Sequence, residues 1–304
     1  MKKKFIIILL SVVCLFFLGY NFLPHFLSKY SNYKTFKNLN LEVKRVKYGD
    51  NYFEYVEGGE GPTILFVHGF KSSKNQWASY MKKFKGKYHI VALDLPGHGK
   101  SPASSDQKYD LISLTTSLSV FIEKKDLNNI NIVGTSMGGG IVSLYAYYHP
   151  EKLDTLVLIN PLGIDRGYRS DLQLLIGQGK NLLFPTSLSE FDEMAIFLTG
   201  KEIKLSHYFK RYALEQMMKE YKFAKEAFNQ LLSSKPLDDV LPKIKTKTLI
   251  LIAQKDKIIH PETFEIFVKL VPNIKAIRLE NANHVLIDQH LDKATKEIDE
   301  FIQK

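Results

Sequence analysis

Residues 130–139 read INIVGTSMGG, and Ser136 stands between glycines directly after a short apolar run. The run is typical of a buried strand, and the apolar spacing from Met137 onward predicts a helix. Gly134 and Gly138 indicate that the backbone turns too sharply, or packs too closely, to accept a Cβ there. The five-residue pattern fits an exposed nucleophile, and it also fits a plain glycine-rich turn, because such short motifs recur by chance.

The elements that would position Ser136 alternate along the chain. Apolar runs typical of covered parallel strands occur at 63–69, 89–101, 130–136, 153–161, 247–256 and 275–280, and helical patterns occur at 77–84, 111–125, 138–149, 261–271 and from 291. Before them, residues 41–59 alternate around Gly49-Asp50-Asn51, which predicts an antiparallel hairpin. This order predicts an α/β fold with a mostly parallel central sheet, right-handed crossovers and helices on both faces.

One long segment interrupts the alternation. Residues 163–243 contain no strand-like run and read as mixed helical sequence, which is too long for a structureless loop. We interpret this segment as a helical cap inserted after the sixth strand. The predicted organisation is an N-terminal anchor and flank (1–28), a core in two parts (29–162 and 244–304) and the cap (163–243).

Composition excludes some functions and leaves others open. Of 304 residues 45% are hydrophobic, which is enough for one large domain with an insertion. Cys14 is the single cysteine, so neither an intramolecular disulfide nor a cysteine-based metal site is expected, and we predict no metal and no cofactor. The net charge of +10 is spread without a nucleic-acid motif, which favours a solvated or membrane-facing surface. We expect no nucleic-acid partner and no obligate protein partner.

The N-terminus is typical of a membrane anchor. Three lysines precede an apolar stretch, and residues 5–23 would form a helix of roughly 28 Å, close to the roughly 30 Å hydrocarbon core. A cleaved signal peptide has the same basic start, but no small-x-small cleavage site follows here. A lipoprotein site at Cys14 would need a small residue where Val13 stands. We therefore expect an uncleaved single-pass anchor, with the N-terminal lysines inside and the catalytic domain extracytoplasmic.

Three segments resemble the α/β-hydrolase superfamily, and in particular its membrane-anchored monoacylglycerol lipase and esterase branch. They occur in the order of that branch and on the expected strands, loops and helices. They are HGFKSSKNQW (68–77), LDLPGHGKS (93–101) and GTSMGGGIVSLYAYYHPEKLDTLVLINPLG (134–163). The resemblance covers nearly everything from about residue 51 to 304. It implies an α/β-hydrolase fold, and it makes the turn at Ser136 a nucleophile elbow.

The resemblance also implies the partners of Ser136. The family order is serine, acid, histidine, and His284 follows the last strand where that histidine belongs. Asp256 ends a strand and begins a D-x-[IV]-[IV]-x-P pattern, so it would orient the imidazole, while Asp165 is the rival acid. Asparagines at 281 and 283 replace the glycines of a common G-x-G-H, and asparagine tolerates a positive φ.

Further residues receive roles through the same resemblance. The backbone amides of Phe70 and Met137 are expected to form the oxyanion hole. Asp94 would fix a loop, and His68 and His98 would be structural. Trp77 and the aromatic residues of the cap are interpreted as core, and His290 as a residue of the last helix.

The predicted function is a serine hydrolase that cleaves carboxylic esters of lipids through an acyl-enzyme on a Ser-His-Asp triad. The expected substrate is a monoacylglycerol or a similar single-chain ester, because an anchored enzyme with a roofed apolar pocket meets such lipids beside the bilayer. Two alternatives stay open: a carbon-carbon bond hydrolase of the same fold, and an anchored binding protein without turnover.

Overall fold

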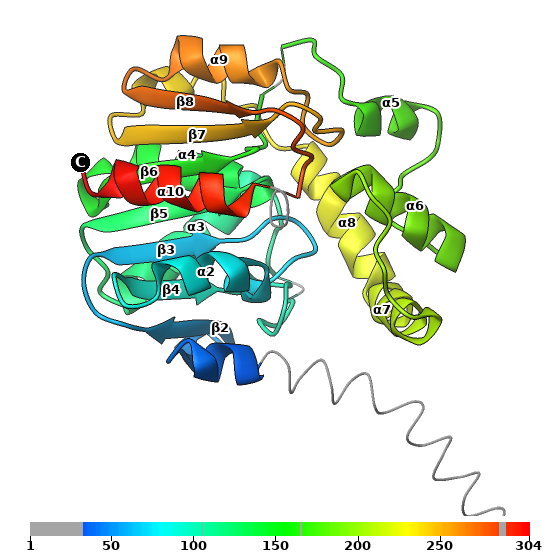
Figure 1. Cartoon of the computed structure of the whole chain (residues 1–304), viewed down its shortest axis with the longest axis horizontal. Coiled ribbons are helices and arrows are strands. Elements are labelled where there is room, and N and C mark those ends of the chain that lie inside the picture. The colour runs from blue at the N-terminus through cyan, green and yellow to red at the C-terminus, as the bar shows by residue number, and fades with distance from the viewer. Residues whose placement is uncertain (1–32, 105, 165, 286–289) are drawn as a thin grey trace, which may run out of the picture.

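The computed structural model describes residues 33–304 except 105, 165 and 286–289. Its centre is an eight-stranded sheet in the order β1-β2-β4-β3-β5-β6-β7-β8 (Figure 1). The strands are β1 (Glu42–Tyr48), β2 (Asn51–Gly58), β3 (Thr63–Val67), β4 (His89–Leu93), β5 (Ile130–Thr135), β6 (Leu153–Ile159), β7 (Lys247–Ala253) and β8 (Ile274–Leu279). β1 and β4 both pair antiparallel with β2, and every other pair is parallel. The predicted fold class is confirmed.

The hairpin turns where its sequence predicts. Tyr48 pairs with Asn51, so Gly49 and Asp50 form the turn, and Gly49 has a φ of 53°. A glycine adopts this left-handed conformation without a steric penalty, which is why a short turn can join β1 to β2 here.

Helices cover both faces of the sheet, as the alternating elements predict. They are α2 (Ala78–Phe84), α3 (Leu111–Lys124), α4 (Met137–Tyr148), α9 (Thr263–Leu270) and α10 (Leu291–Ile302). Leu65 and Val67 of β3 pack in one core with α3 and α4, whereas Ile64 and Phe66 pack in the other core with α2 and α10. Successive side chains of a strand point to opposite faces, so one apolar run fills two cores. Figure 1 shows α2 and α10 in front of the sheet.

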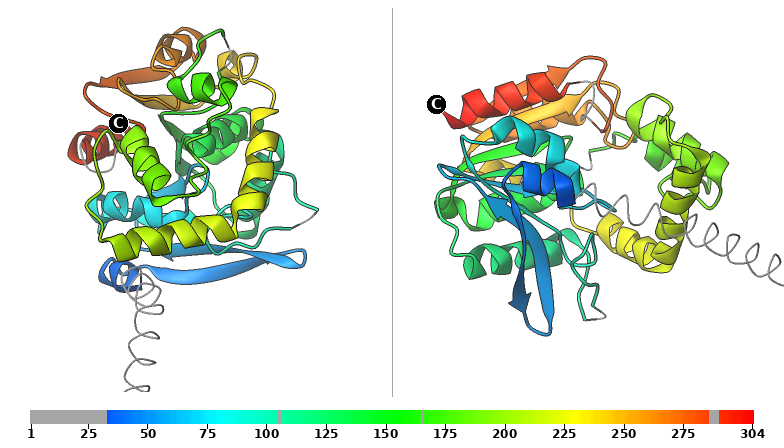
Figure 2. Two further views of the ribbon diagram at one scale, coloured as in Figure 1. Left: turned by 90° about the vertical axis from the view of Figure 1, so that its right-hand side faces the viewer. Right: turned by 60° about the horizontal axis from the view of Figure 1, so that its bottom comes forward.

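The segment between β6 and β7 is helical, as predicted. Its helices are α5 (Asp171–Gly177), α6 (Leu188–Thr199), α7 (His207–Lys219) and α8 (Tyr221–Leu232). They lie beyond the edge of the sheet at which the parallel strands end (Figures 1 and 2). Ser170, Ser187 and Ser206 cap three of these helices by accepting a backbone N–H of the first turn. The division of the chain into core and cap domains stays a prediction.

The N-terminal flank is attached to the core. Residues 33–38 are helical, and Phe36, Leu39 and Leu41 are buried in the core that also holds α2 and α10. The polar sequence of residues 33–38 did not predict this helix. The predicted anchor, residues 5–23, lies outside the described residues, and within residues 33–304 as described no helix is long and apolar enough to cross a bilayer.

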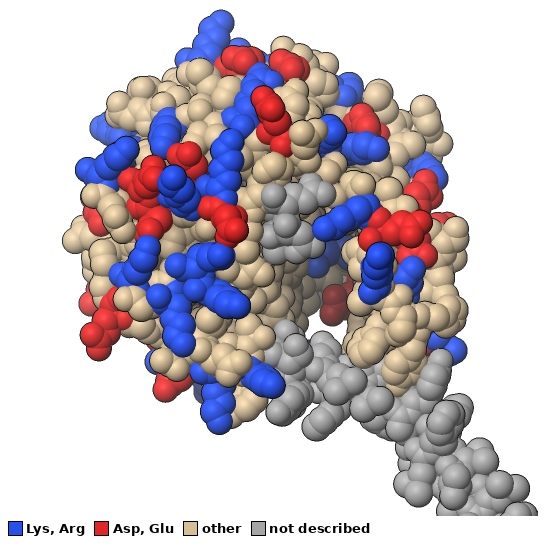
Figure 3. Space-filling model, viewed as in Figure 1, with Lys and Arg blue, Asp and Glu red and all other residues tan. Residues whose placement is uncertain are grey.

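Positive charge is distributed over the face of the molecule seen in Figure 3. Lys and Arg side chains alternate there with Asp and Glu rather than forming a single basic stripe. Many are paired at the surface, for example Lys83 with Asp292 and Lys87 with Asp299. This pattern is typical of a solvated surface.

Candidate active site

Ser136 lies at the turn between β5 and α4 with a left-handed backbone, φ 53° and ψ −122°. A residue with a Cβ is strained in this conformation, so the surrounding structure must hold it in place. The Ser136 N–H donates to Ile159 O at 3.0 Å, and Ser136 O accepts the Leu162 N–H at 2.9 Å. These bonds tie the turn to the end of β6, so the serine stands at the carboxyl edge of the sheet.

The glycines that flank the serine are required by close packing. A Cβ at Gly134 would lie 2.5 Å from Gly138 O, and a Cβ at Gly138 would lie 2.4 Å from Val67 O. Neither carbonyl belongs to a flexible side chain, so a larger residue would displace the backbone. The two glycines therefore allow α4 to begin directly against β3 and β5.

Asp256 and His284 are in contact. His284 Nδ1 is 2.7 Å from Asp256 Oδ2, and Asp256 Oδ1 accepts the N–H groups of Ile258 at 2.7 Å and Ile259 at 3.0 Å. The Asp256 side chain is 1% exposed. These bonds fix the carboxylate, which in turn orients the imidazole ring. Asp165, the rival acid, lies outside the described residues.

Asn160 also positions the histidine, and the sequence gave no sign of it. The side chain is fully buried directly after β6. Its Nδ2 donates to His284 O at 3.0 Å, and its Oδ1 accepts the Ala253 N–H at 2.7 Å. Asn160 thus joins the histidine loop to the end of β7, the strand that precedes Asp256. Asn281, three residues before His284, adopts a φ of 59°, in agreement with its predicted tolerance of a positive φ.

Ser136 and His284 line the same cavity, which has a volume of about 420 Å³. Most of its wall is apolar and comes from two sources: Trp77, Tyr80 and Ile159 of the core, and Leu183, Met194, Leu198 and Met217 of the segment between β6 and β7. Figure 3 shows the molecule hollowed between these two parts. No hydrogen bond joins Ser136 Oγ to the imidazole among the bonds of the described chain, so their catalytic pairing stays a prediction.

The predicted oxyanion donors lie beside the serine. Met137 is the first residue of α4, and Phe70 follows Gly69, whose Cβ position would be 3.3 Å from Ser136 Cβ. Neither Phe70 nor Met137 donates a backbone hydrogen bond among the turn and loop bonds of the described residues. Met137 is a first amide of a helix, and such amides lack intrahelical partners, so its N–H group is available to a substrate oxygen. The Phe70 N–H group lies in the loop after β3 and has no turn or loop partner among the described residues.

His68 and His98 are buried and neutral, as structural histidines are. His68 Nε2 accepts the Leu95 N–H at 3.0 Å, so Nδ1 carries the proton and donates to Gly69 O at 2.7 Å. Burial, with a smaller contribution from His98, lowers the pKa of His68 to about 3. Burial also lowers the pKa of His98, which bonds Pro96 O. His290 lies at the N-terminal cap of α10.

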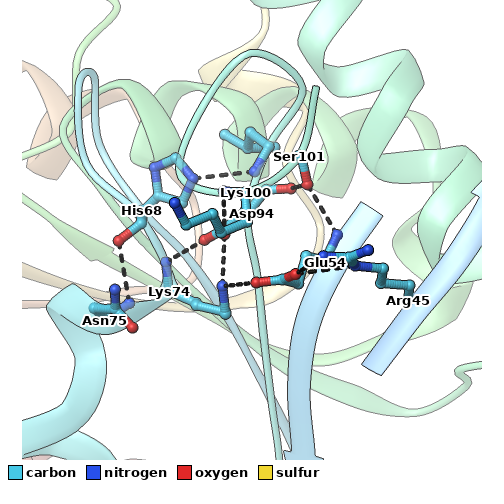
Figure 4. A network of polar contacts seen from close by, with 10 residues as sticks. Arg45, Glu54, His68, Lys74, Asn75, Asp94, Lys100 and Ser101 are labelled. Atoms are coloured by element: carbon cyan, nitrogen blue, oxygen red, sulfur yellow. Dashed lines mark hydrogen bonds and ion pairs between the residues drawn. The ribbon is translucent and has the colours of Figure 1, made fainter. Parts of the chain in front are cut away.

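A buried ion network fixes the loop that follows β3 (Figure 4). Lys74, 3% exposed, donates through Nζ to Glu54 at 3.0 Å and to Asp94 at 2.6 Å. Asp94 also accepts the backbone N–H groups of Lys74 and Lys100, which confirms its loop-fixing role. Burial raises the pKa of Glu54, but Lys74 and Arg45 together hold it below its ordinary value. Lys74 was not predicted, because a lysine in a polar loop is usually solvated.

The sequence is similar to a known protein family and to characterised lipases. Residues 62–291 match the family described as the alpha/beta hydrolase fold. Human monoacylglycerol lipase ABHD6 is 27% identical over 281 residues, which cover 88% of this chain and 83% of that protein. Lipase 1 of Psychrobacter immobilis is 27% identical over 262 residues, covering 84% and 82%.

Solved structures agree with these sequence relatives. A membrane phospholipase A, described as a bacterial virulence factor, has a TM-score of 0.91 at 27% identity and covers 99% of this chain and 98% of its own. A putative lipase from Acinetobacter baumannii has a TM-score of 0.83 at 26% identity, covering 90% and 95%. The meta-cleavage product hydrolase CumD, at 16% identity with a TM-score of 0.75, shares the fold.

Proposed function

The chain belongs to the alpha/beta hydrolase family and is a carboxylic ester hydrolase, and we propose that it cleaves monoacylglycerols and similar single-chain lipid esters through an acyl-enzyme on Ser136. The observation that carries this proposal is the cavity that Ser136 and His284 share, because its largely apolar wall suits one acyl chain.

In the first half of the reaction, His284 removes the proton from Ser136 Oγ as the oxygen attacks the ester carbonyl. Asp256 holds the imidazole in the tautomer that accepts this proton and stabilises the imidazolium. The carbonyl oxygen becomes an oxyanion, and the N–H groups of Phe70 and Met137 stabilise it by roughly 2.7 to 4 kcal/mol each. The imidazolium then gives its proton to the departing alcohol oxygen, which leaves as glycerol, and the acyl group stays on Ser136.

In the second half, a water molecule takes the place of the alcohol. His284 accepts a proton from this water as its oxygen attacks the acyl carbonyl. The bond to Ser136 Oγ breaks, the oxygen recovers the proton from the imidazolium, and the fatty acid leaves. Two easier steps thus replace one difficult hydrolysis.

We further propose that residues 5–23 hold the enzyme in a membrane with the catalytic domain outside the cytoplasm. The apolar length of this stretch supports the anchor, and so does the kinship with a protein described as a membrane phospholipase A. Full-length protein in the soluble fraction after gentle lysis would overturn the anchor. A topology reporter fused after Lys304 determines the side.

Activity-based labelling tests the reaction. A fluorophosphonate should label the wild type and fail to label Ser136→Ala, and the purified enzyme should release fatty acid from monoacylglycerol faster than from triacylglycerol, whose bulk strains one narrow cavity. Labelling without turnover of any ester would leave the nucleophile standing, remove the lipase proposal and put the carbon-carbon bond hydrolase in its place. Absence of both would favour the binding protein.

A further inference from the structure

One wall of the cavity carries a cation. Lys71 lines the cavity together with Ser136 and His284, and it directly follows Phe70, the proposed oxyanion donor. Its backbone is left-handed, with a φ of 53°, so the chain bends sharply at this position. The rest of the cavity wall is mostly apolar, which makes a lysine there unusual.

Among the described residues, the Lys71 ammonium is only partly satisfied. Nζ donates one hydrogen bond, to Leu183 O at 3.0 Å, and lies 4.8 Å from the centre of the Phe184 ring. An ammonium has three donors, so two remain for another acceptor. Among the ion pairs of the described residues, none includes Lys71, and burial lowers its pKa to about 8 against a weaker opposing attraction from Glu220.

A half-buried cation that pairs with no carboxylate of the described residues favours an anionic ligand. An acyl chain gains nothing beside an ammonium, so it would take the wall formed by Met194, Leu198 and Met217. The anion therefore belongs to the alcohol part of the ester. Gly69, two residues before Lys71, approaches Ser136 Oγ to 3.8 Å at its Cβ position, so the lysine follows closely along the chain from the segment that packs against the serine.

We propose that Lys71 forms a subsite for an oxyanion on the leaving group, so that the enzyme prefers single-chain esters whose alcohol carries a phosphate, such as lysophospholipids. This inference rests on the proposed function, because it assigns the head group of the same ester. A carboxylate on the alcohol has the same recognition chemistry and is tested separately.

Lys71 also touches Leu183 and Phe184, which belong to the segment between β6 and β7. If Lys71 served only to hold that segment against the core, replacing Lys71 would lower kcat/KM for every substrate to the same degree. The decisive quantity is therefore the ratio of kcat/KM for an anionic ester to kcat/KM for its neutral counterpart.

The experiment uses full-length enzyme in a non-ionic detergent with monomeric 1-hexanoylglycerol and 1-hexanoylglycerol 3-phosphate. Wild type should prefer the phosphate ester, Lys71→Met should lower the phosphate-to-neutral ratio about 10- to 100-fold, and Lys71→Arg should keep most of it. Lys82→Met is the control for net charge, because Lys82 is exposed on α2 outside the cavity, and it should leave the ratio unchanged. O-Hexanoyl glycolate is the substrate that tests recognition of a carboxylate on the alcohol.

An equal loss for both hexanoyl esters in Lys71→Met, or an unchanged ratio, would overturn the subsite. A ratio that depends on Lys71 only for the glycolate ester would assign the anion as a carboxylate instead of a phosphate. The proposed function can fail independently of the subsite, so binding is also measured without turnover. Calorimetry gives the affinity of 1-hexanoylglycerol 3-phosphate for Ser136→Ala and for the double variant Ser136→Ala/Lys71→Met. Equal affinity of these two proteins would also overturn the subsite.

Discussion

The Asp256 carboxylate is held by bonds to both of its oxygens. Oδ1 accepts two backbone N–H groups and Oδ2 faces the His284 ring, so the imidazole has one favoured orientation. In Asp256→Asn the amide nitrogen would face Nδ1 and select the wrong tautomer. We expect kcat for a p-nitrophenyl ester to fall on the order of 10⁴-fold, by analogy with serine protease triads. Full activity of Asp256→Asn together with an inactive Asp165→Asn would reverse the assignment of the acid.

His68 gives a prediction about pH. Its imidazole stays neutral in the folded protein down to about pH 3, whereas its ordinary pKa is 6.5. Between these values the unfolded chain binds the extra proton, so the stabilisation is complete above pH 6.5 and is lost as the pH falls, by about 1.4 kcal/mol per pH unit. Urea unfolding at pH 7, 6 and 5 should show a smaller decline for His68→Gln than for wild type. Identical declines would contradict a neutral His68.

At the scale of elements, the buried ion network holds the loop after β3 in place. Lys74→Met would leave the carboxylates of Glu54 and Asp94 buried without their shared cation. Removing one partner of a buried pair costs about 3–5 kcal/mol, so the free energy of unfolding in urea should fall by that amount. Lys82→Met, on the exposed face of α2, should change it by less than about 0.5 kcal/mol. A Lys74→Met protein as stable as wild type would show that the network contributes nothing.

The strands and helices were predictable because each leaves a local pattern. The run at 63–67 is apolar throughout and fills two cores, and the G-x-S-x-G turn needs glycines that the sequence displays. Asn160 and Lys71 left no such pattern. Asn160 meets His284 across 124 positions, and Lys71 meets Leu183 across 112, so their roles arise only when distant segments pack together. The roles of Asp256 and His284 came from a family resemblance, since spacing alone does not reveal them.

At the scale of the whole molecule, the cavity belongs to no single element. The core contributes Ser136, His284 and the aromatic side chains of Trp77 and Tyr80 to the cavity wall. Helices α6 and α7 contribute Met194, Leu198 and Met217. Figure 2 shows these helices standing beyond the carboxyl ends of the strands. Acyl-chain selection should therefore be controlled from the inserted segment, while the chemistry is controlled from the core.

Two adjacent methionines of α7 allow this division to be tested. Met217 lines the cavity, and Met218 is 41% exposed on the outside of the same helix. Each buried CH₂ of an acyl chain is worth about 0.8 kcal/mol, roughly a factor of four in kcat/KM. Met217→Trp fills the space that the last methylenes would occupy, so kcat/KM for a decanoyl ester should fall by about 10-fold or more while that for a butanoyl ester falls much less. Met218→Trp adds the same bulk to solvent and should leave the ratio of the two esters unchanged. Equal ratios in Met217→Trp and wild type would place the acyl chain elsewhere, whereas a matching loss in Met218→Trp would trace the effect to a distorted α7.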